Sequence, residues 1–250
     1  MPSKTILIFD IESEYGHFRK FNTTTSPLTY SIPPRPALVG LLGAILGIER
    51  EVSTGKFNQG VVPVAELFAK PDTELAVQLV NPVKKVPMAF NLLDTEKSGA
   101  SFFNIKQRTQ IEFELLKHPC FRVFVACAND KLMQQLVDKV QHNQAHFTPY
   151  LGLSQFTATC KFVAVAEAHL LASTEAQEVV TAVNLSENRE IAFEYEQQMK
   201  YTSDTFPIEL NAQRVVQSYA EVLIEAHGKP IRVKSERIYT TKQHGNLLFL

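Results

Sequence analysis

The pattern of apolar and polar positions predicts that the chain opens with a strand followed by a helix. Residues 4–13 are rich in β-branched and apolar side chains, which is typical of a buried first strand. Pro33, Pro34 and Pro36 then mark the start of a helix over 37–47, because proline suits the first helical turn and disfavours helical backbone before it.

Three glycines of this predicted helix, Gly40, Gly43 and Gly47, follow spacings of three and four and therefore share one face. A bare glycine face lets a helix pack unusually close to a sheet, or lets a sugar-phosphate backbone approach the helix. The spacing alone leaves both alternatives open.

The apolar pattern predicts four further strands in the first part of the chain, over 74–80, 108–116, 120–128 and 162–171. A helix is expected over 131–142, with Asp130 as its cap. The order suits a ferredoxin-like β-α-β-β-α-β unit, whose sheet many RNA-binding modules use. Residues 81–106 have no clean period and predict a long functional loop that lies against a partner.

The second part of the chain is rich in predicted strands. The extended segments are 179–183, 190–199, 216–226 and, after a turn over 227–230, a last strand with Arg232 and Lys234 on one side. We therefore expect an α+β protein: a ferredoxin-like (RRM-like) amino-terminal domain over 1–172 and a smaller strand-rich carboxy-terminal subdomain over 173–250.

Composition favours a cytoplasmic globular protein. Hydrophobic residues make up 45% and charged residues 20% of the sequence, and no apolar run approaches the roughly 18 residues of a membrane span. The amino terminus lacks the features of a signal peptide. The three cysteines form no CxxC pair, and His142 and His146 have helical spacing but no nearby Glu or Cys. We expect neither a disulfide framework, nor a metal site, nor a cofactor.

The net charge of −1 hides segments of opposite sign. No acid occurs from 15 to 48 or from 75 to 93, whereas 163–225 has three bases and eleven acids, a net charge of −8. Residues 226–250 have five bases and one acid, a net charge of +4. This distribution predicts a basic surface for a polyanion and an acidic one that faces elsewhere. The alternative is that the segments interleave in space and cancel.

Two segments resemble a known family. Residues 16–47, GHFRKFNTTTSPLTYSIPPRPALVGLLGAILG, resemble the amino-terminal signature of the CRISPR-associated family-five proteins. The sequence of this segment is closest to that of subtype I-B members. Residues 149–156, PYLGLSQF, are similar to the mid-chain motif of that family.

The resemblance implies a repeat-associated RNA-binding (RAMP) fold and a role in antiviral defence. The chain would be a non-catalytic subunit of a type I surveillance complex (Cascade), binding and capping the 5′ handle of the crRNA through a protruding loop. Its partners would be the crRNA, the backbone subunit and the large subunit, with target DNA reached only through the complex and no membrane involved.

Binding a single-stranded RNA end requires cations for phosphates, aromatic faces for bases, and hydroxyls for base edges or 2′-hydroxyls. The predicted RNA-binding residues are His17, Arg19, Lys20, Thr24, Ser26, Tyr30, Arg35, Lys84, Lys85, Gln107 and Arg108. Arg35 stands at the predicted helix start, where free backbone N–H groups and the helix dipole favour the binding of a phosphate. Gln107 and Arg108 have the alternative of being exposed edge residues, and Phe18 and Phe21 are expected in the core.

The resemblance also raises a catalytic alternative, because subtype I-C members cut precursor RNA without a metal. This chemistry needs a general base, a cation and an acid, and Lys117, His118 and Tyr30 are the candidates. Lys117 and His118 share a site only if the chain turns at Pro119. Subtype I-B complexes carry a dedicated nuclease, so we expect no catalytic residue here and keep a metal-independent endoribonuclease as the alternative.

Overall fold

The computed structural model describes residues 3–21, 26–48, 60–70, 72–93, 108–173, 175–186 and 191–250. Two predicted RNA-binding residues, Thr24 and Gln107, lie outside these ranges, as do residues 94–106 of the expected loop.

The centre of the main sheet is β1 (Ser3–Glu12), which confirms the predicted first strand. It pairs antiparallel with β6 (Cys120–Cys127) and with β7 (Thr159–Leu170), and β3 (Thr73–Leu79) pairs antiparallel with β6. The strand predictions over 74–80, 120–128 and 162–171 are confirmed with small shifts at their ends. The four strands lie side by side in the order β7-β1-β6-β3.

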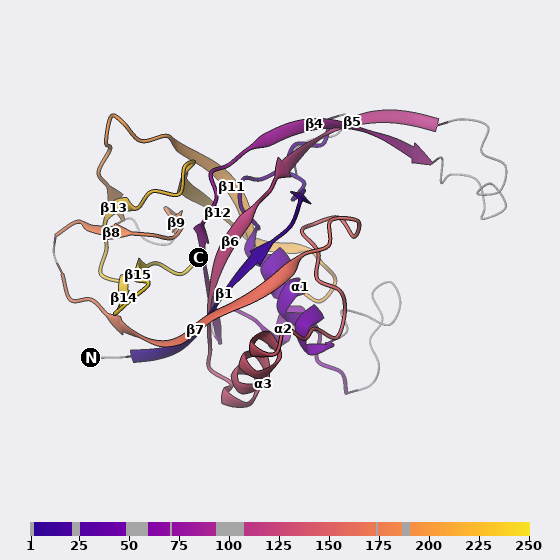
Figure 1. Ribbon diagram of the computed structural model, residues 1–250. Helices are drawn as coiled ribbons and strands as arrows, with labels where there is room; N and C mark the ends of the chain where they lie inside the picture. Colours follow the sequence, from indigo (N-terminus) through magenta and orange to yellow (C-terminus); the bar gives the residue numbers. More distant parts are fainter. Residues whose placement is uncertain are drawn as a thin grey trace.

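The main sheet continues into the last part of the chain and curls as it does so (Figure 1). Beyond β7 it adds β14 (Tyr239–Thr241), β15 (Gly245–Leu247), β8 (Gln177–Val179), β13 (Ile231–Lys234) and β10 (Ala192–Phe193), giving nine strands. The sheet and the largest apolar cluster thus both include residues from each side of the predicted boundary between 1–172 and 173–250.

Three helices pack on one face of the sheet: α1 (Arg35–Leu46), the short α2 (Val64–Leu67) and α3 (Asp130–Gln141) (Figure 1). Both long helices were predicted. The cap of α3 was predicted wrongly: Asn129, not Asp130, has extended backbone, and its side chain accepts the Leu132 N–H. Among the described residues, no helix is long and apolar enough to cross a membrane.

The glycines of α1 serve helix packing at one position and leave another open. A Cβ at Gly43 would lie 2.6 Å from Cγ2 of Val64, so Gly43 allows α2 to pack closely against α1. Gly40 is exposed, and a Cβ there would meet nothing within 4 Å.

A separate three-stranded sheet consists of β11 (Tyr201–Leu210), β12 (Val216–Glu225) and β9 (Val183–Asn184), and its β11 packs on α1. The alternation predicted over 216–226 holds as far as Val222, and then both faces are buried. The prediction of a strand over 190–199 was wrong except at β10. The strand β11 was missed, because its first half is polar and exposed and carries no apolar alternation.

Residues 81–106 were predicted to be a loop, and this is wrong for 85–93, although 81–84 form no helix or strand. β4 (Lys85–Leu93) pairs with β5 (Arg108–Lys117), and β2 (Tyr15–Gly16) adds to β5. Val86, Met88, Phe90 and Leu92 alternate along β4. Pro87 obscured the pattern, but β4 is an edge strand, where proline is tolerated. The β4–β5 hairpin projects from the body of the protein (Figure 1).

A buried carboxylate, Glu225, holds the turn that follows β12. It accepts backbone N–H groups from Lys200 at 3.0 Å, His227 at 2.8 Å and Lys229 at 2.9 Å. Burial acts to raise the pKa of this carboxyl, but the donors outweigh burial and hold the pKa below its usual value.

We predict that Glu225→Gln lowers the free energy of unfolding by about 1.5–3 kcal/mol at neutral pH, because an amide group would face a backbone donor. The lowered pKa means that the ionised carboxylate stabilises the fold above the unfolded-state pKa, and this stabilisation is lost as pH falls through the folded-state pKa. Urea unfolding should therefore show a difference between wild type and variant that shrinks below about pH 4. A difference independent of pH would contradict this role.

Candidate nucleic-acid interface

His17, the first predicted RNA-binding residue, joins three segments. Its backbone N–H donates to Leu151 O at 3.0 Å, and its ring Nδ1 lies 2.8 Å from Glu114 O in β5. Because Glu114 O can only accept, Nδ1 carries the proton, and burial lowers the pKa of the imidazole. His17 is therefore a neutral structural residue within the described part of the chain rather than an exposed cation.

Gly152 makes the contact with His17 possible. It has φ 86, a conformation that favours glycine, and a Cβ at this position would overlap the His17 carbonyl oxygen. The Leu151 N–H donates to Phe156 O at 2.9 Å and closes the loop. The two segments that resemble the family, 16–47 and 149–156, thus meet at this point, which we call the His17 junction.

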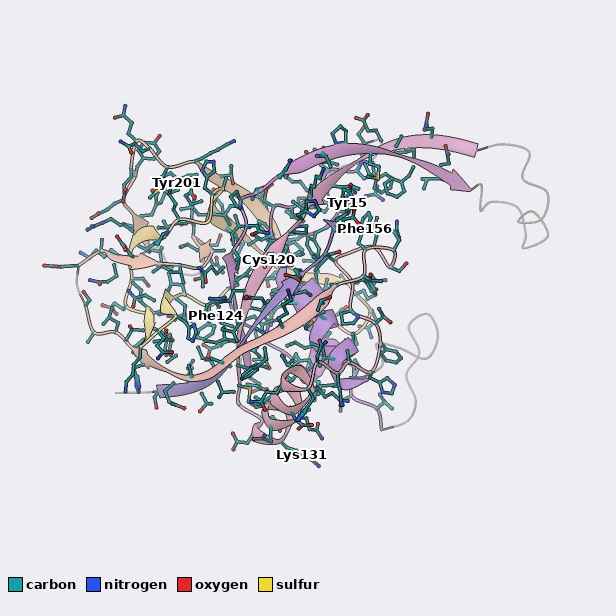
Figure 2. The ribbon with its side chains drawn as sticks, viewed as in Figure 1. Tyr15, Cys120, Phe124, Lys131, Phe156 and Tyr201 are labelled. Carbon is teal, nitrogen blue, oxygen red and sulfur yellow. The ribbon has the colours of Figure 1, made fainter. Side chains whose placement is uncertain are left out.

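Aromatic rings connect the His17 junction to the projecting hairpin. Tyr15 and Phe156 lie with centroids 6.0 Å apart (Figure 2), Phe156 and Phe90 6.4 Å, Phe90 and Phe113 4.8 Å, and Phe113 and His17 5.2 Å. Such edge and tilted contacts contribute beyond area burial. They pack the base of the hairpin against the His17 junction.

Two adjacent predicted cations have different environments. The Lys85 ammonium donates to Glu114 Oε1 at 2.9 Å and to Thr29 O at 2.8 Å, and Glu114 Oε1 also accepts the Thr29 N–H at 3.1 Å. Lys85 thus ties the hairpin base to the body. Lys84 is exposed and remains suited to a phosphate.

The basic segment that follows β2 folds back on itself. The backbones of Arg19 and Thr29 form an isolated antiparallel β-bridge, and the Lys20 N–H donates to Leu28 O at 2.9 Å. The Lys20 ammonium lies 2.6 Å from Oδ2 of Asp204 in β11. The segment is therefore held against β11 by an ion pair.

Two other predicted RNA-binding side chains belong to the interior. Tyr30 stacks on Phe206 with centroids 4.3 Å apart and donates its hydroxyl to Thr205 O at 2.8 Å, and burial raises the pKa of Tyr30 to about 12. Arg35 is only 3% exposed, because its guanidinium reaches inward to the carbonyls of Phe68 at 3.0 Å and of Thr73 at 2.7 Å. The prediction that these two groups are exposed to RNA is corrected.

The exposed part of the predicted set is Arg19, Ser26 and Lys84. For Arg108 the structure describes the backbone at the start of β5. Phe18 is in the core, as expected, but Phe21 is not: it is 62% exposed. Sequence reasoning missed Gly152 and Glu114, and the signal for Gly152 was its place in the PYLGLSQF segment.

The catalytic alternative loses one of its three groups, because the Tyr30 hydroxyl is buried and bonded. His118 is exposed and has φ 49, so the chain does turn between Lys117 and Pro119. Among the described residues, no three His, Cys, Asp or Glu side chains form a group suited to a metal. His142 ends α3, so the helical spacing with His146 does not persist.

The face of the main sheet opposite the helices is occupied. Leu247 packs on it in a second apolar cluster, and the remaining part carries ion pairs. Arg122 Nε lies 2.7 Å from Asp10 Oδ1, and Lys161 pairs with Glu12. This face is therefore less suited to a polyanion than the surface around the His17 junction.

The sequence of the chain matches a known family. A sequence model described as "CRISPR-associated protein (Cas_Cas5)" matches residues 6–219. The chain belongs to the Cas5 family of CRISPR-associated proteins. The matched range includes both segments of the His17 junction and the hairpin strands, so these features are parts of the Cas5 region. No curated protein matches the chain.

Solved structures support the Cas5 fold at low sequence identity. A CRISPR protein from Archaeoglobus fulgidus is 10% identical with a TM-score of 0.52, covering 97% of both chains. A chain of a CRISPR RNA-guided surveillance complex is 13% identical with a TM-score of 0.50, covering 90% of this chain and 91% of the other. A chain of the type III-B Cmr-beta complex bound to cognate target RNA is 11% identical with a TM-score of 0.50, covering 92% and 86%.

We predict opposite effects for two glycine substitutions in this Cas5 protein. Gly152→Ala should lower the free energy of unfolding by more than about 1 kcal/mol, because of its positive φ and the His17 carbonyl oxygen. Gly40→Ala, in open space on α1, should raise the free energy by roughly 0.5–1 kcal/mol. Denaturant unfolding measures both, and equal effects would show that the His17–Gly152 contact does not constrain the fold.

Proposed function

We propose that this chain is a non-catalytic, cytoplasmic subunit of a type I surveillance complex, closest to subtype I-B, that binds and caps the 5′ handle of a crRNA. The observation that carries the proposal is the His17 junction, where the two family segments meet at the base of a projecting hairpin. The strand–helix–strand–strand–helix–strand order with β7-β1-β6-β3 pairing supports a ferredoxin-like amino-terminal unit.

The hairpin suits a hook around a single strand. It leaves the body at the edge of the acid-free segment 15–48, and β4 itself lies in the acid-free segment 75–93. A phosphate chain that crosses the hairpin base would meet the exposed cations Arg19 and Lys84, and Glu114, an acid at this base, is paired with Lys85. The neighbouring backbone and large subunits would then contact the remaining surfaces of the chain.

Binding without cleavage is favoured over the endoribonuclease alternative. A proton-transfer group must reach the reacting oxygen, and the Tyr30 hydroxyl is instead buried against Thr205 O with its pKa raised to about 12. Incubation of the purified chain with labelled repeat RNA in EDTA distinguishes the functions. Retention of the RNA without cleavage supports the proposal, and cleavage supports the alternative. If the RNA is neither retained nor cleaved, the chain is an interaction protein that does not bind RNA.

The adjacent lysines provide a matched pair of variants. Lys84→Ala should weaken repeat-RNA binding and reduce the salt slope of log K by about 0.7, the contribution of one phosphate contact on a single strand, with unfolding unchanged. Lys85→Ala should lower the free energy of unfolding by about 1 kcal/mol or more, because Glu114 and Thr29 lose a donor. An unchanged salt slope for Lys84→Ala would contradict its contact with phosphate.

A further inference from the structure

Phe21 and Tyr219 form an exposed aromatic pair between segments that are far apart in the sequence. Phe21 is 62% and Tyr219 47% exposed, yet their ring centroids lie 5.3 Å apart with an interplanar angle of 51°. Phenylalanine is mostly buried in soluble proteins, so a pair that touches and still presents this much surface to solvent suggests a binding role.

Tyr219 stands on a strand, and Phe21 follows a residue whose backbone is hydrogen-bonded. Tyr219 stands on β12 opposite Pro207 of β11. Phe21 follows Lys20, whose backbone N–H donates to Leu28 O. The ammonium of Lys20 pairs with Asp204 of β11, the strand that pairs with β12. The rings therefore meet a ligand without first being ordered, which reduces the entropic cost of binding.

The charges around the pair favour a nucleic acid over an apolar protein surface. Arg19 and Lys20 directly precede Phe21, and no acid occurs between residues 15 and 48. Asp204 of β11 lies against this segment and is paired with Lys20 at 2.6 Å. Glu221 is exposed on the same side of β12 as Tyr219, and its negative charge opposes the binding of a phosphate there. Aromatic faces beside cations are the usual platform for unpaired bases, whereas lysine is depleted in protein interfaces.

We propose that Phe21 and Tyr219 form a stacking platform for one unpaired base of the bound RNA. The inference rests on the proposed function and deepens it, because it brings β12 of the acidic 163–225 segment to the RNA side. The tilted rings form a wedge in which the base stacks on one ring and meets the edge of the other. Lys20 and Arg19 then lie beside the adjoining phosphates.

The test uses the full chain and repeat RNA carrying 2-aminopurine at successive positions. Phe21→Ala and Tyr219→Ala should each weaken binding, by about 5- to 150-fold for a lost base stack, and leave the salt slope unchanged. The 2-aminopurine signal at one position should change on binding to the wild type and not to Phe21→Ala. Tyr219→Phe keeps the ring and should bind as the wild type does.

Tyr195→Ala is the matched control, because Tyr195 is 70% exposed and packs on Tyr201, which lies away from Tyr15 and Phe156 in Figure 2. It should bind RNA as the wild type does.

Wild-type affinity in both ring variants would overturn the inference, and loss of partner-subunit assembly in those same variants would assign the pair to a protein interface. A reduced salt slope would also overturn it. Failure of the wild type to bind RNA would instead contradict the proposed function.

Discussion

The close backbone contact between His17 and Gly152 is the constraint on which the candidate interface depends. It brings the loop 149–156 against the segment that follows β2, and the His17 ring then reaches Glu114 in β5. Because Gly152 has a positive φ and no room for a Cβ, the contact requires glycine. The aromatic contacts at the hairpin base begin at this junction, while the Lys20–Asp204 ion pair holds the basic segment against β11.

Charge in this protein is arranged by pairing as much as by clustering. Lys20 and Lys85 stand in acid-free segments of the sequence, but each has an acidic partner in space, Asp204 and Glu114 respectively. Half-buried cations require such partners, since desolvation without compensation is costly. Arg19 and Lys84 are exposed, whereas Lys20 and Lys85 are half-buried, so the exposed basic surface is narrower than the sequence alone indicates. The Lys20–Asp204 pair also positions Phe21 beside β12.

The elements with strong periodicity could be predicted from the sequence, and those that depend on distant partners could not. β1, α1, α3 and β12 carry clear apolar patterns, and α1 also has proline at its start and glycine at its end. β4 contains Pro87, and β11 begins with polar residues, so their strand character depends on partners brought together by folding. Arg35 was placed correctly at a helix start, but its inward direction depends on the Phe68 and Thr73 carbonyls. Burial frequencies put Phe21 in the core, whereas its position against β12 leaves it exposed.

The central claim is that RNA lies along the surface formed by 15–21 and 26–30, the hairpin base and the aromatic pair, and not on the outer face of the main sheet. Ultraviolet crosslinking of the chain to repeat RNA, mapped by peptide, tests this most directly. The account predicts crosslinks within 15–48 and 84–93, with a separate one at Tyr219. Crosslinks concentrated around Asp10, Arg122 and Lys161, or spread through 163–225 without Tyr219, would show that the RNA binds elsewhere.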